Sequence, residues 1–181
     1  MDPREEICNW ARELYELRLT TSRGGNLSVR QEDRVFITPS GVHKGRLSPR
    51  DIVVTDMQGK VMGRGRPSIE LAMHLAVYRV RPDARAVIHA HPVHATALAV
   101  AGRTIDPSMH PELEASFPKL PLIPPAPCGS EELANLVAEA VKEADVVLLG
   151  GHGTLALGRS VEAALVLTES VEFGAHLLLH L

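Results

Sequence analysis

In the first half of the chain, the apolar positions change from a helical spacing to the alternation typical of strands. Residues 3–19 carry an apolar stripe at helical spacing, behind a helix start formed by Asp2 and Pro3. Alternating apolar and polar residues between turn residues then indicate strands, and Ser68 is a helix cap. The pattern predicts a helix over 3–19, strands over 26–30, 34–38, 52–56 and 60–62, and a helix over 68–80.

The second half begins with a short, wholly apolar strand that ends in histidines and continues into a small-residue helix. Residues 103–129 hold many prolines and no clear period, so we expect a long loop there that serves function or forms a contact surface. The pattern predicts a strand over 85–91, a helix over 92–101, a helix over 130–143, strands over 145–149 and 154–157, and a helix from 160 to the C-terminus.

Early strands, intervening helices and several apparent hairpins favour an α/β fold with a mixed sheet and helices packed on it, not a doubly wound parallel sheet. We find no internal repeat, low-complexity segment or linker, and 181 residues suit a single domain over 1–181.

Composition narrows the class of protein. Hydrophobic content is 45% and charged content 23%, close to the globular average. The net charge of −3 gives no support to a nucleic-acid or membrane partner. Cys8 and Cys128 form neither a CxxC pair nor a disulfide framework. A charged start and the lack of a membrane-length apolar run lead us to expect a cytoplasmic protein.

The strongest chemical signal is a set of three histidines. His89 and His91 lie two residues apart on one strand, so their side chains point to the same face. His152, in a Gly-His-Gly sequence after another apolar strand, is the best third ligand. Three neutral imidazoles with an open fourth position suit a catalytic zinc or a similar divalent ion.

Glu70 follows the capping Ser68 by two residues. Without a metal site it would be an ordinary acid favoured by the helix dipole. Beside a metal that polarises a carbonyl, the same carboxylate would serve as the base that takes the adjacent proton. His74 lies one turn further along the same helix face, where a core or surface position is expected and support of the site is the alternative.

Two glycine-rich turns offer backbone N–H groups and small polar side chains, the features of phosphate-binding concavities. One spans 23–26 and the other 38–41. Together with Ser68 they would form a phosphate site if the fold brings them together.

Five short motifs in this order resemble the class II aldolase and adducin-like family. They are Gly25-Asn26-Leu27-Ser28, Ile37-Thr38-Pro39-Ser40-Gly41, Pro67-Ser68-Ile69-Glu70, His89-Ala90-His91-Pro92-Val93-His94 and Gly151-His152-Gly153. The resemblance covers nearly the whole chain and implies a three-layer α/β/α fold with a mainly antiparallel central sheet.

The resemblance also implies an activity and a set of site residues. The activity is reversible cleavage of a phosphorylated ketose to dihydroxyacetone phosphate and an aldehyde, in a homotetramer with sites at subunit contacts. The implied residues are His89, His91 and His152 as zinc ligands, Glu70 as acid/base, and Gly25, Asn26, Ser40, Gly41 and Ser68 as the phosphate site. His110 lies near the position of the family's second acid, a tyrosine from a neighbouring subunit, and would substitute for it.

Alternatives remain on the same scaffold. Sugar-phosphate 4-epimerases of this type tend to carry Asp in place of Glu70, which favours the aldolase, whereas a methylthioribulose-phosphate dehydratase is excluded less firmly. A non-catalytic adducin-like binding domain would be free to lose the histidines. A metallohydrolase barrel needs roughly 250 residues, which this chain lacks.

Overall fold

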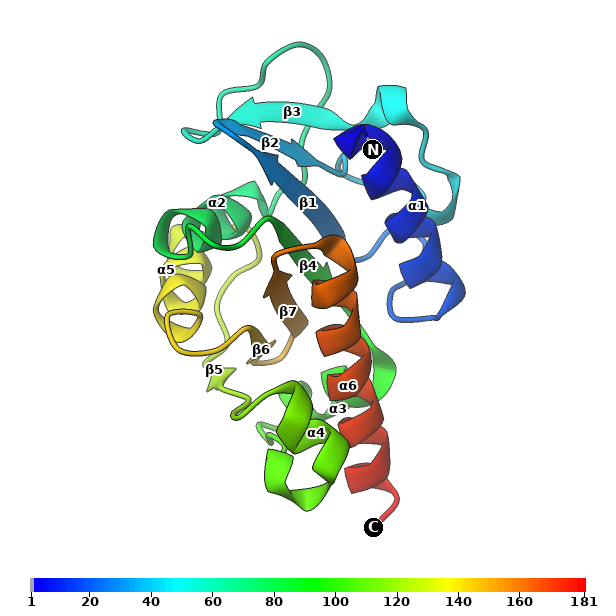
Figure 1. The fold of residues 1–181 in the computed structure, drawn as a ribbon, viewed down its shortest axis with the longest axis vertical. Coiled ribbons are helices and arrows are strands. Elements are labelled where there is room, and N and C mark those ends of the chain that lie inside the picture. The colour runs from blue at the N-terminus through cyan, green and yellow to red at the C-terminus, as the bar shows by residue number, and fades with distance from the viewer. Residues whose placement is uncertain (1) are drawn as a thin grey trace.

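A seven-stranded sheet runs through the centre of the computed structural model, which describes residues 2–181 (Figure 1). Its strands follow the order β3-β2-β1-β4-β7-β6-β5, and all neighbours are antiparallel except β5 and β6. The strands are β1 (Asn26–Gln31), β2 (Arg34–Ile37), β3 (Val53–Asp56), β4 (Ala86–Ala90), β5 (Leu122–Ile123), β6 (Val146–Leu149) and β7 (Gly153–Gly158). The predicted mainly antiparallel sheet is confirmed.

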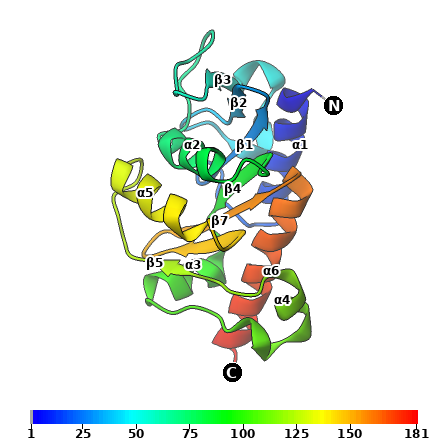
Figure 2. The same cartoon turned by 60° about the vertical axis from the view of Figure 1, so that its left-hand side comes forward.

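Helices cover both faces of this sheet (Figure 2). They are α1 (Pro3–Glu16), α2 (Leu71–Val80), α3 (Val93–Val100), α4 (Pro111–Ser116), α5 (Glu131–Ala140) and α6 (Val161–Leu179). One apolar core joins the sheet to α2 and α5, and a second joins it to α1, α3, α4 and α6. The chain therefore has the predicted three-layer α/β/α architecture. None of the helices in residues 2–181 is both long and apolar enough to cross a membrane.

The alternation of β4 decides where its histidine points. Ala86 and Ile88 belong to the core beneath α6, whereas Val87 belongs to the core beneath α2 and α5. Because side chains alternate along a strand, His89 shares the face of Val87 and is buried toward α2.

The predicted strand over 60–62 is wrong. Val61 forms only a single bridge with Thr55. Gly63 and Gly65, both with positive φ, follow directly. Glycines contribute no side chain to pack on a sheet, so the segment leaves the sheet after one pairing.

The predicted start of the second helix is also wrong, because α2 begins at Leu71. The Ser68 hydroxyl accepts a hydrogen bond from the backbone N–H of Glu70 at 3.3 Å, and the Ser68 carbonyl accepts one from Leu71 at 3.1 Å. Ser68 and Glu70 therefore lie in a turn that precedes the helix.

The long loop predicted over 103–129 contains regular structure. A 3₁₀ turn (Pro107–Met109), the helix α4 and the strand β5 all fall within it. Pro107 and Pro111 each occupy the first position of their helix, where proline is favoured because no N–H is needed. Two of the seven prolines in this segment are therefore helix starts.

Candidate active site

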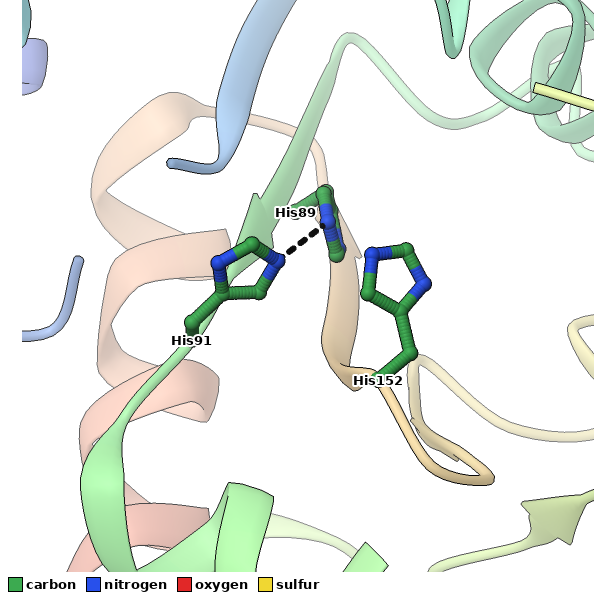
Figure 3. Close-up of side chains that lie close together, drawn as sticks. All are labelled: His89, His91 and His152. Carbon is green, nitrogen blue, oxygen red and sulfur yellow. Dashed lines mark hydrogen bonds between the residues drawn. The ribbon is translucent and has the colours of Figure 1, made fainter. Parts of the chain in front are cut away.

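His89, His91 and His152 converge at one point of the fold, as Figure 3 shows. His89 belongs to β4, His91 follows it, and His152 lies in the turn between β6 and β7. Because β4 pairs antiparallel with β7, the end of one strand meets the start of the other. Each ring offers a nitrogen within 4.8 Å of the other two, and Nε2 of His91 lies 2.9 Å from Nε2 of His89.

A backbone contact fixes the tautomer of His89. Its Nδ1 donates to the carbonyl of Thr154 at 2.8 Å, so Nδ1 carries the hydrogen and Nε2 turns a lone pair toward the cluster. Burial is the main cause that lowers the pKa values of His89 and His91, and the neighbouring histidines lower them further. Both rings are therefore neutral near pH 7, which is the form that binds metals.

Gly25 allows the chain to pass directly beside this cluster. Its φ is +61°, and a Cβ there would lie 2.6 Å from the carbonyl oxygen of His89. A larger residue would be both strained and in collision with the backbone of β4.

The carboxylate of Glu70 lies against the histidines. Its Oε2 accepts a hydrogen bond from Nδ2 of Asn26 at 2.8 Å and lies 3.1 Å from Nε2 of His89. Its Oε1 has no hydrogen-bond partner, although it is buried, and lies 3.6 Å from Nε2 of His152. A buried, unbonded carboxylate oxygen is unfavourable by itself. A divalent cation held by the three rings would satisfy it, so these residues fit a metal ion.

A series of buried polar side chains, hydrogen-bonded to one another, leads away from Glu70. Since Asn26 turns its Nδ2 to Glu70, its Oδ1 accepts from Nε2–H of His74. Nδ1 of His74 then accepts from the hydroxyl of Ser28 at 2.7 Å, and Ser28 accepts from Tyr78 at 2.8 Å. Burial lowers the pKa of His74 to about 3, so this ring stays neutral. His74 is a core residue, as expected, but one that supports Asn26.

The turn 38–41 lies beside Ser68, and both it and the turn 23–26 line one pocket. Ser40 N–H donates to the Arg66 carbonyl at 3.1 Å, and Ser68 N–H donates to the Thr38 carbonyl at 3.2 Å. Beside them lies a pocket of about 230 Å³, named here the site pocket. Its lining includes Gly25, Asn26, Ser40, Gly41, Ser68, Glu70, His91 and His152, with His89 behind them.

The sequence pattern does not predict two residues that line the site pocket. Lys44 is only 4% exposed, and Cys128 places its Sγ 3.6 Å from Nε2 of His152. Both lie outside strands and longer helices, where neither spacing nor neighbours give a signal. By contrast, the spacing of the sequence does indicate Ser28 and Tyr78. Ser28 shares a strand face with Asn26, and Tyr78 shares a helix face with residues 70 and 74.

The structure does not bring His110 to this pocket within one chain. Its Nδ1 accepts from Glu112 N–H at 3.2 Å and so caps α4. Its ring packs edge-on against Phe173 of α6, with 5.3 Å between the ring centres.

A larger hollow of about 700 Å³ lies elsewhere, beside Arg81, Arg159 and Glu162. Its lining includes no histidine or cysteine. The histidines and Glu70 make the smaller site pocket the candidate active site.

Comparisons with known proteins agree with this geometry. The family model described as "Class II Aldolase and Adducin N-terminal domain" matches residues 5–179. An L-fuculose phosphate aldolase of Methanococcus vannielii is 36% identical over 95% of this chain and 92% of its own length. One of Escherichia coli is 38% identical over 96% of this chain and 81% of its own.

A solved structure of an L-fuculose 1-phosphate aldolase superposes with a TM-score of 0.91 at 35% identity, covering 99% of this chain and 85% of that one. These matches confirm the expected fold and support an enzyme of the lyase class. The chain belongs to the class II aldolase and adducin N-terminal domain family.

Proposed function

We propose that this chain is a zinc-dependent aldolase that reversibly cleaves a ketose 1-phosphate, of the L-fuculose 1-phosphate type, to dihydroxyacetone phosphate and an aldehyde. One observation carries the proposal: Glu70, the histidine cluster and both glycine-rich turns meet at a single pocket. The L-fuculose phosphate aldolases among the relatives support the substrate type.

His89, His91 and His152 would hold the divalent ion. When bound, it would supply Lewis-acid polarisation of the substrate oxygens next to the bond that breaks. The Thr154 carbonyl fixes the ring of His89 for this purpose. The unbonded Oε1 of Glu70 faces the same point.

Gly25, Asn26, Ser40, Gly41 and Ser68 would receive the phosphate of the substrate. Turn amides and small hydroxyls suit phosphate oxygens, because each donates a hydrogen bond without a bulky side chain. Anchoring the phosphate fixes the distance from that group to the reacting carbon.

Glu70 would move the proton at carbon. In the cleavage direction, the electron pair of the broken carbon–carbon bond stays on the dihydroxyacetone phosphate fragment, and Glu70 protonates that carbon. In the synthetic direction Glu70 removes the same proton. The Asn26 hydrogen bond holds Oε2, so Oε1 is the oxygen directed to substrate.

The hydroxyl that becomes the aldehyde must lose its proton as the bond breaks. We assign this step to His110 of a neighbouring subunit, in a cytoplasmic homotetramer. Because His110 lies outside the pocket of its own chain, this role requires a subunit contact.

The test is incubation of the zinc-loaded protein with L-fuculose 1-phosphate and detection of dihydroxyacetone phosphate by its coupled reduction. We expect formation of dihydroxyacetone phosphate that Glu70→Gln slows by about 10²- to 10⁴-fold. An isomeric sugar phosphate would indicate an epimerase, and loss of water a dehydratase. Neither turnover nor stoichiometric metal would indicate an adducin-like binding domain.

A further inference from the structure

Lys44 is a buried ammonium group without an acidic partner. Its side chain is only 4% exposed, at the start of a 3₁₀ turn (Lys44–Arg46). Nζ donates to the carbonyl of Val42 at 3.2 Å and to that of Arg23 at 3.4 Å. No carboxylate of residues 2–181 forms an ion pair with it.

This arrangement is unfavourable for the ammonium group by itself. Burial of a charge is unfavourable unless an opposite charge or several hydrogen bonds compensate it. An ammonium has three donors, and the two carbonyl contacts of Lys44 are long. Burial lowers the pKa of Lys44 to about 8, which still leaves the group mostly protonated at neutral pH.

The position of Lys44 indicates what its missing partner is. It lines the site pocket together with Ser40, Gly41 and Ser68. It also lines a small adjoining cavity with Asn26 and His89, so it lies close to both the glycine-rich turns and the histidine cluster. Arg23, the other cation of the pocket, is exposed to solvent, where an ion pair is worth little.

We propose that Lys44 is the positive charge that binds the phosphate of the substrate and thereby selects phosphorylated sugars. This inference rests on the proposed function and adds a charged donor to a site whose five predicted residues are all neutral. A phosphate dianion would supply the buried ammonium with its missing partner. A charge-assisted hydrogen bond of this kind is about twice as strong as a neutral one.

The test is calorimetric titration of the zinc-loaded protein with inorganic phosphate. Lys44→Met removes the charge from a buried position and keeps much of the side-chain volume. Lys44→Gln removes the charge but keeps a donor for the two carbonyls, so it serves if the methionine variant folds poorly. Lys60→Met is the matched control, because Lys60 is exposed and does not line the pocket.

We expect both Lys44 variants to bind phosphate about tenfold or more weakly, a loss of about 1.4 kcal/mol, while Lys60→Met equals the wild type. All variants should keep their zinc. Phosphate should raise the melting temperature of the wild type and of Lys60→Met, but not of Lys44→Met. Without phosphate, Lys44→Met should be at least as stable as the wild type.

Wild-type phosphate affinity in both Lys44 variants would overturn the inference, as would a wild type that binds no phosphate. The two proposals fail separately. Dihydroxyacetone phosphate formed by the wild type, with phosphate affinity independent of Lys44, would leave the aldolase standing and remove the role of Lys44. If phosphate binding depends on Lys44 but the protein forms no dihydroxyacetone phosphate, the role of Lys44 stands and the aldolase proposal fails.

Discussion

Nδ2 of Asn26 donates a hydrogen bond of 2.8 Å to Oε2 of Glu70 and leaves Oε1 of the same carboxylate without a partner. This asymmetry assigns the two oxygens different tasks. Both oxygens lie against the histidine cluster, but Oε2 is held by a side chain that β1 fixes in place, whereas Oε1 accepts no hydrogen bond. A carboxylate oriented in this way is prepared to exchange a proton with a substrate held at the same point.

Replacement of Glu70 by Gln tests that assignment. The amide keeps the shape of the side chain and can still accept from Asn26, but it cannot carry a proton to and from carbon. We expect kcat to fall by about 10²- to 10⁴-fold, the usual contribution of a general acid or base, with zinc content unchanged. The measurement is steady-state cleavage beside metal analysis, with Glu132→Gln on an exposed turn of α5 as control. A variant with wild-type kcat would remove Glu70 from the proton-transfer step.

Replacement of His91 by Ala tests the metal site. Loss of one of three protein ligands should weaken zinc binding by more than the roughly 10- to 100-fold that removal of an outer-shell partner costs. Metal analysis after dialysis is the measurement. His180→Ala is the control, because His180 is exposed and its ring hydrogen-bonds only to the carbonyl of His176, away from the site pocket. Stoichiometric zinc in His91→Ala would refute the proposed ligand set.

The histidine cluster could be predicted from sequence because its geometry follows from local rules. The period of two in β4 and the position of His91 directly after it put two rings on one side. A glycine-flanked histidine between two apolar strands supplied the third. The antiparallel pairing of β4 with β7 then determined that they would meet, and the family resemblance had already implied such a sheet.

Lys44 and Cys128 could not be predicted in the same way. Each lies where the chain has no period, and each reaches the pocket through long-range packing of turns. The residue type also argues against a buried position for Lys44, because lysine is rarely buried without a partner. The misplaced start of α2 has a related cause, since Ser68 can cap a turn as well as a helix.

His74 makes the stability of the metal-free protein depend on pH. Its folded-state pKa of about 3 lies below its ordinary value of 6.5 because burial disfavours the charged ring. Between these values the unfolded chain binds a proton that the folded chain does not, so stability is full above about pH 6.5 and falls as the pH falls toward about 3. The slope approaches about 1.4 kcal/mol per pH unit for one proton.

His74→Gln should flatten that slope, because glutamine offers a donor and an acceptor but does not titrate in this range. The measurement is the free energy of unfolding in urea at pH 7 and pH 5, without metal. His89 and His91 contribute a slope of the same sign to both proteins, so the difference isolates His74. His180→Gln should behave like the wild type, and equal slopes in all three proteins would contradict the buried neutral ring.

Cys128 provides a chemical probe of the site pocket. It is exposed, lines the pocket and places Sγ 3.6 Å from Nε2 of His152, whereas Cys8 is 5% exposed, on the buried face of α1. An alkylating reagent such as N-ethylmaleimide should therefore modify Cys128 first, although slowly, because burial raises the pKa of this thiol. The added group would occupy a pocket of only about 230 Å³, so cleavage activity should be lost as the label is incorporated.

Cys128→Ser should remain active under the same treatment, while Cys8→Ser should be inactivated like the wild type. Mass spectrometry of labelled peptides together with residual activity decides the outcome. Full activity in wild-type protein labelled at Cys128 would separate this pocket from the site of turnover.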